Sequence, residues 1–386
     1  MNNKEIRALF PMANQVVYLD SAALVLKPQT AIDAMVDFYT NKSISSRTSD
    51  TKIGYLVNQK INQVRQKVAD LLDADSSEII FTSGTTESIN NFAYMFSQTL
   101  TQGDIVLLSA YNHSSNMIVW IELSKKYGFT VEIVENLYEN IRKGVKLVSL
   151  SQETNNFNAN FNIEKIAQKA HEVGAFVFND AAQAISHDKV SLKVVDGIAF
   201  SSNKFYGPTG IGVLAIKKEF LIKLKPAKFG GGTVVDVPKD HNNWTMRNTI
   251  SAFEPGTPDL AGFFMFDAAL DFFNSIGYQK TQAILDELAN YLYDRLTEVE
   301  GLKIHTKRGD YITLVTFEKY GTQDVATYLG SKDIYTISGI FCAPYLRNIY
   351  ENHSYLRISL GIYNNYEDID KLIEALEQGD YYEAIF

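Results

Sequence analysis

The stretch "AFSSNKFYGPTGIGVLAI" occupies residues 199–216, and the rest of the sequence can be interpreted outward from it. Two apolar runs of strand length enclose a polar turn that contains Lys204. Lysine side chains are mostly solvated, so a lysine between two segments that resemble buried strands needs a chemical reason. An amine in a partly desolvated pocket has a lowered pKa and attacks carbonyl groups. The stretch therefore predicts a reactive amine at the end of a buried strand.

The same alternation of short apolar runs and helical patterns fills the middle of the chain. The predicted strands are "EIIFTSG" at 78–84, "DIVLLSA" at 104–110, "FTVEIV" at 129–134, "VKLVSLS" at 145–151, "AFVFNDAA" at 175–182, "GIAFSS" at 197–202 and "GIGVLAIKK" at 210–218. Nearly continuous apolar strands separated by helices are typical of a largely parallel sheet covered on both faces. We predict an α/β fold with a mostly parallel seven-stranded sheet between helices.

The pattern changes near residue 260, where long helices begin, notably "YQKTQAILDELANYLYDRLTEV" at 278–299. The C-terminal part mixes the strands "YITLVTFE" and "YLRISLGIY" with the helices "TQDVATYLG" and "YEDIDKLIEALEQ". A chain of 386 residues is too long for one simple core. We predict a large domain over residues 17–265, and a smaller α+β domain formed by residues 1–16 and 266–386.

The composition argues against nucleic-acid-binding, membrane-spanning, secreted and metal-binding proteins. The net charge is -9 and no run of lysine or arginine occurs, which argues against a nucleic-acid partner. No apolar stretch approaches the roughly 20 residues that span a bilayer, and the N-terminus lacks the pattern of a secretory signal, so we expect a cytoplasmic protein without membrane contact. The single cysteine, Cys342, excludes an intrachain disulfide, and the six scattered histidines match no ligand spacing, so we predict no metal.

Polar residues gather where the predicted strands end, which is where ligands bind in open α/β sheets. Residues 84–86, "GTT", open a helix and could cradle a phosphate, although taken alone they are more simply explained as an ordinary helix cap. His113 and Asn155 follow two other strands, and each could be a plain capping or loop residue. Asp180 ends a further strand with Gln183 three residues on, and an acid there is costly unless it pairs with a cation.

Together these residues match the needs of one cofactor. Pyridoxal phosphate needs a lysine for its aldehyde, an acid for its pyridine nitrogen, donors for its phosphate and a flat group over its ring. The chain offers Lys204, Asp180, the hydroxyls of Thr86 and Ser201, and His113 at successive strand ends. Each match is weak alone, but their combination predicts a pyridoxal phosphate site.

Several motifs carry a resemblance to a known family. They are "FTSGTTESIN", "DAAQAISHDKV", "SSNKFYGPTGIG", "GGGTVV", "FEPGTPD", and a cysteine followed 15 residues later by the arginine of "LRIS". With them the chain resembles the fold-type I pyridoxal phosphate enzymes of aminotransferase class V, and within these the cysteine desulfurases and selenocysteine lyases of the Suf type. The match extends from "VVYLDSAALVLKP" at 16–28 to "YLRISLGIYNNYEDIDKLIEAL" at 355–376.

The resemblance implies a role for each matching residue. Lys204 would bond the cofactor aldehyde, Asp180 would pair with the ring nitrogen, and His113 would stack on the ring. The other cofactor contacts would come from Gln183, Asn155, Thr85, Thr86, Ser201, Asn203 and, across a homodimer interface, Thr257. Arg357 would bind the substrate carboxylate, with Asn155 nearby and with Arg47 of the partner subunit, since a guanidinium suits a carboxylate.

The resemblance also implies a reaction. L-Cysteine would be the substrate, Lys204 would remove its α-proton, and Cys342 would take its sulfur as a persulfide while alanine leaves. The segment "SGIFCAPYL" resembles the short-loop subgroup, which implies a separate sulfur-acceptor protein and a role in iron–sulfur or tRNA thiolation pathways. Without the resemblance, a single cysteine is more simply explained as a small buried hydrophobe.

Some positions depart from the family's pattern and keep alternatives open. Asn203 stands where histidine usually precedes the lysine, and Ile337, Ile340 and Phe341 replace an arginine and two histidines before Cys342. These departures lie beside the nucleophile and on the substrate side, so they bear on substrate and rate. A selenocysteine lyase, another class V C–S lyase or aminotransferase, and a catalytically silent sulfur-transfer scaffold are the alternatives.

Overall fold

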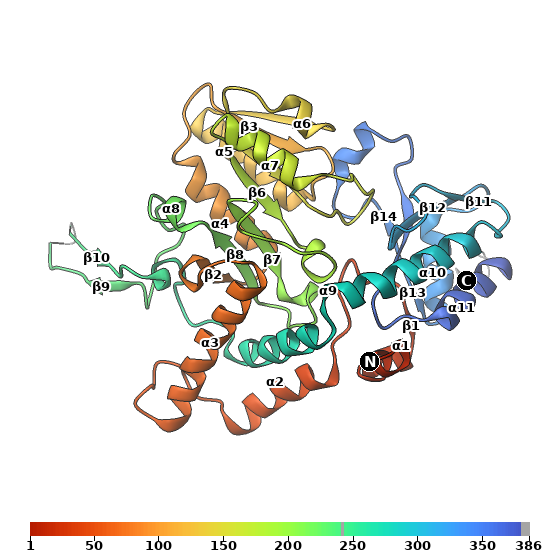
Figure 1. Ribbon diagram of the computed structural model, residues 1–386, viewed down its shortest axis with the longest axis horizontal. Coiled ribbons are helices and arrows are strands. Elements are labelled where there is room, and N and C mark those ends of the chain that lie inside the picture. Colours follow the sequence, from red (N-terminus) through yellow and green to blue (C-terminus); the bar gives the residue numbers. More distant parts are fainter. Residues whose placement is uncertain (241–242, 380–386) are drawn as a thin grey trace.

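A central sheet dominates the structure, a computed structural model that describes residues 1–240 and 243–379 (Figure 1). Within these residues it has seven strands, in the order β2 (Ile79–Thr82), β8 (Gly212–Ile216), β7 (Gly197–Ser201), β6 (Phe176–Asp180), β5 (Val145–Leu150), β3 (Ile105–Ser109) and β4 (Thr130–Val134). β8 runs antiparallel to both neighbours, and the other adjacent pairs run parallel. The predicted α/β fold and its mostly parallel seven-stranded sheet are confirmed.

Helices cover both faces of this sheet, as its nearly continuous apolar strands predict. Successive side chains of a strand point to opposite faces, so β8 places Val213 and Ala215 in one core cluster and Leu214 and Ile216 in the other. Among the helices that contribute to the first cluster are α3 (Lys52–Leu71), α7 (Ile163–Glu172) and α9 (Leu260–Leu296). Among those that contribute to the second are α4 (Thr85–Ser97) and α5 (Ile118–Tyr127).

Helix α9 begins at Leu260, where the sequence predicts that long helices start. Its first half, including Phe263 and Phe266, is almost entirely buried and therefore has no amphipathic period. Gly277 interrupts the helix with φ +76°, a conformation that glycine adopts without steric cost. The break separates this buried half from the half that begins with the predicted segment 278–299.

The smaller part of the chain holds a four-stranded antiparallel sheet in the order β11 (Leu302–Ile304), β12 (Ile312–Phe317), β15 (Tyr355–Ser359) and β14 (Ile337–Gly339). Helices α10 (Thr322–Ser331) and α11 (Tyr366–Glu377) accompany it. The N-terminal segment lies beside it (Figure 1): β1 (Val17–Tyr18) pairs with β13 (Ile334–Tyr335), and Arg7 of α1 (Asn3–Ala8) forms an ion pair with Asp368. The domain boundaries given above stay a prediction.

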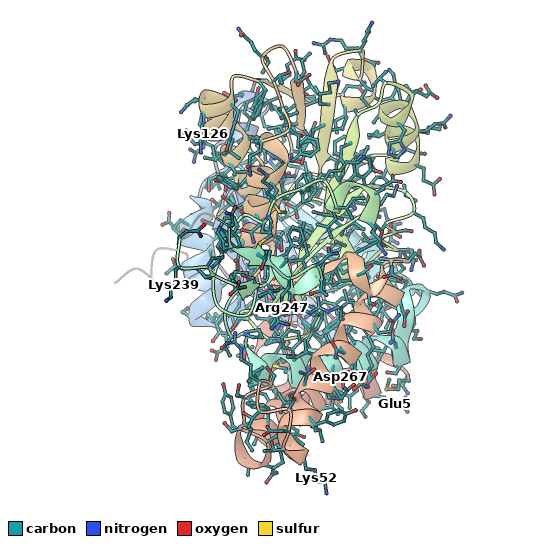
Figure 2. The ribbon with its side chains drawn as sticks, turned by 90° about the vertical axis from the view of Figure 1, so that its left-hand side faces the viewer. Glu5, Lys52, Lys126, Lys239, Arg247 and Asp267 are labelled. Atoms are coloured by element: carbon teal, nitrogen blue, oxygen red, sulfur yellow. The ribbon has the colours of Figure 1, made fainter. Side chains whose placement is uncertain are left out.

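Short elements complete the described chain: α2 (Gln29–Asn41), α6 (Leu137–Asn140), α8 (Lys218–Leu221), and the hairpin strands β9 (Val234–Asp236) and β10 (Thr245–Met246). The hairpin projects from the left side of Figure 1, and Lys239 and Arg247 lie on that face in Figure 2. Among the described residues, no helix combines the length and apolar character that crossing a bilayer requires.

Candidate active site

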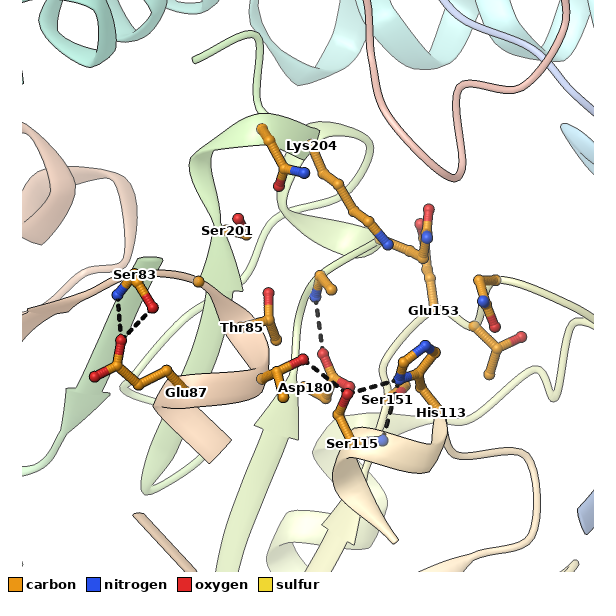
Figure 3. A pocket seen from close by; sticks show the side chains of 17 residues that line it. Ser83, Thr85, Glu87, His113, Ser115, Ser151, Glu153, Asp180, Ser201 and Lys204 are labelled. Carbon is orange, nitrogen blue, oxygen red and sulfur yellow. Dashed lines mark hydrogen bonds between the residues drawn. The ribbon is translucent and has the colours of Figure 1, made fainter. Parts of the chain in front are cut away.

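The carboxyl ends of the central strands open into a cavity of about 340 Å³ (Figure 3). Most of the predicted cofactor residues line it: Thr85, Thr86, His113, Asn155, Asp180, Gln183, Ser201, Asn203 and Lys204. Parallel strands bring their ends to one edge of a sheet, which is why residues far apart in the sequence meet there. The cavity therefore lies where the sequence predicts a ligand.

Lys204 points into this cavity from a short 3-10 turn, Ser202–Lys204, which directly follows β7 (Figure 3). Burial lowers the pKa of Lys204 from its ordinary value to about 8, although the negative charge of Asp180 opposes the shift. Loss of water disfavours the ammonium form more than the nearby carboxylate restores it. About a tenth of Lys204 is therefore an uncharged nucleophile at pH 7, and this fraction grows as the pH rises.

Asp180 is the last residue of β6 and is only 4% exposed. Its Oδ1 accepts a hydrogen bond from the backbone N–H of Ala182 at 3.2 Å. Burial raises the pKa of this carboxyl to about 6, although the Ala182 bond and the charge of Lys204 lower it. A buried acid of this kind is stabilised by a cationic partner, and a protonated pyridine nitrogen would be one.

His113 is both a capping residue and a cavity residue. Its Nδ1 accepts from the backbone N–H of Ser115 at 3.1 Å, which caps the 3-10 turn Ser114–Asn116. Burial, assisted by the positive charges of Lys204 and Arg357, lowers the pKa of His113 to about 4. The ring is therefore neutral at pH 7 and presents a flat surface to the cavity.

The N-terminus of α4 supplies a phosphate cradle. Gly84 precedes the helix, and the first turn carries Thr85 and Thr86. Free backbone N–H groups and the helix dipole favour an anion there. Close approach makes glycine necessary at residue 212, because a Cβ on it would lie 2.5 Å from the backbone of Gly84.

The unpaired polar atoms of the cavity test whether the cofactor fits. Thr85 Oγ1 and Asn203 Oδ1 are buried and have no hydrogen-bond partner among the described residues. Buried polar atoms are nearly always paired, so this pair indicates a polar ligand. Together with a buried acid, a neutral imidazole and a lysine of lowered pKa, they fit pyridoxal phosphate.

Asn155 connects the cavity to the predicted substrate arginine. Its backbone oxygen accepts from Arg357 Nη1 at 3.1 Å, while its side-chain Nδ2 donates to the carbonyl of Phe341 at 2.7 Å. Gln183 also lines the cavity, and its Nε2 donates to the carbonyl of Ala22 at 2.8 Å. The side chains of Asn155 and Gln183 are thus fixed by the polypeptide itself.

Arg357 is 2% exposed and already has an acidic partner, Asp20, that the sequence does not predict. Its Nη2 donates to Asp20 Oδ1 at 2.7 Å, and its Nε is buried without a partner in the described chain. Asp20 lies inside the quoted motif "VVYLDSAA", where an acid after an apolar run was the available clue. The predicted carboxylate-binding residue is present, but an internal acid shares its charge.

Cys342 lies in the short loop between β14 and the 3-10 turn Pro344–Asn348, and it is exposed. The loop location agrees with the prediction, and the exposure argues against a buried structural cysteine. Its carbonyl accepts from the backbone N–H of Ser114, the residue after His113, at 2.8 Å. The negative charge of a Cys342 thiolate would raise the pKa of Lys204, as that of Asp20 does, whereas the positive charge of Arg357 lowers it.

Two predicted residues lie elsewhere in the chain. Thr257 lines a separate cavity beside Gly256 and Asp259, and Arg47 donates from Nη2 to the carbonyl of Gly256 at 3.3 Å. Both are exposed. The single chain thus brings Arg47 and Thr257 next to each other but outside the cavity of Lys204.

The sequence does not predict two further residues at the cavity, Glu153 and Lys27. Glu153 lines the cavity, accepts from the Tyr311 hydroxyl at 2.7 Å and lies 3.4 Å from His187 Nδ1. Lys27 donates to the carbonyl of Asn203 at 2.7 Å, and burial lowers the pKa of this lysine to about 7. Glu153 follows the predicted strand 145–151 by two residues, a clue that the sequence offered, whereas Lys27 follows none of the predicted strands of the sheet and is placed here only by the folded chain.

Comparison with known proteins identifies the family. A family-wide sequence profile, aminotransferase class-V, matches residues 17–372. The chain belongs to the aminotransferase class-V family. Its cofactor is pyridoxal phosphate, and this class V chain is an enzyme.

Individual relatives of this class V enzyme are similar over their full lengths. A probable cysteine desulfurase from Ureaplasma parvum is 34% identical, with 97% of this chain and 96% of the relative covered. A cysteine desulfurase from Haloferax volcanii is 31% identical, with 94% and 89% covered. The solved structure of the cysteine desulfurase CsdA from Escherichia coli, in an S-sulfonic acid form, superposes with a TM-score of 0.92 at 29% identity, covering 99% of each chain.

Proposed function

We propose that the chain is a cysteine desulfurase that removes sulfur from L-cysteine and leaves L-alanine and a persulfide on Cys342. The observation that carries the proposal is the exposed Cys342, held by Ser114 beside a cavity that contains Lys204 and Asn155. A sequence relationship to named desulfurases supports it.

Different cavity residues would bind different parts of the cofactor. When bound, pyridoxal phosphate supplies an aldehyde that joins amino groups and a ring that accepts the electron pair released at the α-carbon. Lys204 would hold the aldehyde, Asp180 would keep the ring nitrogen protonated, and the neutral His113 would lie against the ring. Thr85, Thr86, Ser201 and Asn203 would hold the phosphate. Gln183 and Asn155 would lie near the ring hydroxyl.

Substrate binding uses charge complementarity. The α-carboxylate of L-cysteine pairs with Arg357, whose buried and unpaired Nε is a free donor. Asp20 and the backbone oxygen of Asn155 fix the guanidinium of Arg357 through Nη2 and Nη1. A fixed carboxylate directs the substrate sulfur toward the Cys342 loop.

The sulfur step involves the chain's own groups. Lys204, uncharged in part because of its lowered pKa, removes the α-proton of the substrate. The thiolate of Cys342 attacks the substrate sulfur, a sulfur–sulfur bond forms, and the bond between that sulfur and the substrate β-carbon breaks. The electron pair of that bond stays on the three-carbon product. This product regains an α-proton from Lys204, takes a second proton at its β-carbon in place of the one that the Cys342 thiol gave up, and leaves as L-alanine. One L-cysteine and one thiol thus give one L-alanine and one persulfide.

A homodimer completes the proposed site. Apolar side chains that are more than half exposed gather on α2, at the start of α3 and around the hairpin: Val36, Tyr39, Tyr55, Phe229, Val235 and Val237. Exposed apolar patches mark interaction surfaces, and a second copy is the partner that brings Arg47 and Thr257 to the neighbouring cavity.

Mixed dimers test the sharing of residues between subunits. Arg47→Ala and Lys204→Ala chains are each expected to be inactive alone. Dissociated and re-associated together, they should regain activity, because one site of the mixed dimer then has Lys204 from one chain and Arg47 from the other. If Arg47 serves its own chain's site, no site of the mixture is complete and no activity returns.

The outer sulfur of the persulfide must leave Cys342, and we propose that a separate protein accepts it. Cys342 lies on a loop of a few residues between two ordered elements, so it cannot carry sulfur far. The acceptor's own thiol would attack the outer sulfur and restore Cys342. Iron–sulfur cluster assembly or tRNA thiolation would then receive the sulfur.

The decisive experiment measures both products. Protein loaded with pyridoxal phosphate is incubated with L-cysteine and a thiol reductant, and alanine and sulfide are quantified beside Cys342→Ser. Equal amounts of both, lost in the variant, support the proposal. Alanine without dependence on Cys342 contradicts the persulfide step, and selenocysteine turnover retained in the variant supports a selenocysteine lyase instead.

A further inference from the structure

The residue before Cys342 contacts the residue proposed to bind the substrate carboxylate. The ring of Phe341 lies against the guanidinium of Arg357, with Cζ 4.7 Å from the ring centroid. Phe341 is 8% exposed and Arg357 is 2% exposed, so the contact is shielded from water. A cation over an aromatic face is attracted by the ring's electron distribution, and the attraction is larger when both groups are desolvated.

The backbone of the loop adopts an unusual conformation at this point. Phe341 and Cys342 both have φ +55°, in the left-handed region that non-glycine residues rarely occupy. Such residues persist only when surrounding contacts determine them. Two hydrogen bonds hold the carbonyls, from Asn155 Nδ2 to Phe341 and from the N–H of Ser114 to Cys342. Both bonds act on the backbone, so the Phe341 ring provides a separate side-chain contact.

Asn155, Phe341 and Arg357 each contact the other two at the base of the loop. Asn155 donates to the carbonyl of Phe341 and accepts from Arg357 Nη1, while the Phe341 ring packs on Arg357 itself. A displacement of the guanidinium therefore moves both supports of the loop. The thiol follows directly after Phe341, so its position depends on where Arg357 lies.

We propose that Phe341 is a positioning residue that links the Arg357 guanidinium to the Cys342 thiol. The stack of ring on guanidinium keeps the loop in its left-handed conformation and aligns the thiol with a substrate whose carboxylate Arg357 binds. The proposal rests on the proposed function for the identity of that substrate. Phe341 itself transfers no proton and forms no bond.

Reactivity of the single cysteine tests the link without any substrate. Cys342 is the one cysteine of the chain, so iodoacetamide labels one thiol per subunit. Alkylation rates at pH 8 are compared for cofactor-loaded wild type, Phe341→Leu, Phe341→His and Ile340→Val. Leucine keeps an apolar side chain but removes the π face, whereas neutral histidine keeps a flat ring. The Ile340 variant changes a neighbour on the same loop that packs against the same apolar cluster as Phe341, so it controls for a change in apolar packing alone.

We expect Phe341→Leu to raise the alkylation rate roughly 3- to 30-fold, because a released loop exposes its thiol more often. Phe341→His and Ile340→Val should alkylate at the wild-type rate. An unchanged rate in Phe341→Leu, or the same rise in Ile340→Val, would overturn the proposal.

Turnover gives a second readout that a merely structural role would not produce. In Phe341→Leu, kcat for L-cysteine should fall while KM stays near the wild-type value, because Asp20 and Asn155 still hold Arg357. Phe341→His should restore kcat. A rise in KM with unchanged kcat would contradict positioning of the thiol. Failure of wild type to form alanine would refute the proposed function, whereas the alkylation result would still decide the role of Phe341.

Discussion

Arg357 and Asp20 form an ion pair of 2.7 Å between Nη2 and Oδ1, directly beside the cavity that contains Lys204. The acid lies two residues after β1, and the arginine lies in β15 of the small sheet. Burial raises the pKa of Asp20, while Arg357 opposes the shift. The substrate carboxylate thus meets a guanidinium that an internal carboxylate has already partly neutralised.

Removing this internal competitor should strengthen substrate binding. In Asp20→Asn, the amide oxygen can still accept from Arg357, but the negative charge is gone. We expect KM for L-cysteine to fall about 3- to 10-fold, with a smaller change in kcat, since attraction between the guanidinium and the carboxylate is no longer shared. Steady-state kinetics check this result, with Asp294→Asn as a control that removes an exposed acid paired with Arg308. A KM above the wild-type value would mean that Asp20 chiefly orients Arg357.

Covalent attachment should occur at Lys204 and not at the second buried lysine near it. Lys27 also has a lowered pKa, about 7, but its Nζ donates to the carbonyl of Asn203. Borohydride reduction of the loaded protein, followed by peptide mapping, should label Lys204 alone. Lys27→Ala should keep the label and Lys204→Ala should lose it while remaining folded by circular dichroism. A label on Lys27 in the wild type would refute the assignment.

Capture of the cofactor by protein freed of it should depend on pH through Lys204. The folded amine has a pKa of about 8, so its reactive uncharged form grows as pH rises through that value. The rate of pyridoxal phosphate uptake, followed by absorbance from pH 6.5 to 9.5, should rise and level off above about pH 8. Nα-acetyl-lysine, as a control, should show no plateau in this range. The same absence of a plateau in the protein would contradict the lowered pKa.

Asp180 should destabilise the cofactor-free protein but be needed for the activity of the cofactor-loaded protein. Its folded pKa, about 6, lies above the unfolded value, so ionisation opposes folding. This cost is absent below pH 4, grows between pH 4 and 6 and is constant above. Asp180→Asn should therefore stabilise the cofactor-free protein at pH 7 by about 1–3 kcal/mol and have little effect near pH 4.

Thermal unfolding of the cofactor-free Asp180→Asn protein at both pH values measures this difference. In the loaded protein, the same variant should retain the cofactor but lose most turnover, because an amide does not hold the ring nitrogen protonated. Destabilisation at pH 7, or near-normal turnover, would each contradict the role given to Asp180.

The sequence by itself determined the sheet and the cavity edge. Strand-length apolar runs from 78 to 216 predict the seven strands, because a strand buried on both faces must be apolar at successive positions. Lys204, Asp180 and His113 stand immediately after such runs, and parallel strands end on one side of a sheet. Their meeting therefore needs no further information from the tertiary structure.

The tertiary structure alone decided the contacts between distant segments. Asp20 pairs with Arg357, Lys27 contacts Asn203, and Glu153 joins Tyr311 only because loops from different parts of the chain pack together. A local sequence pattern does not specify which distant loop will pack against the segment. The left-handed backbone of Phe341 and Cys342 is likewise fixed by distant partners, Asn155 and Ser114, and no local preference of these residue types would indicate it.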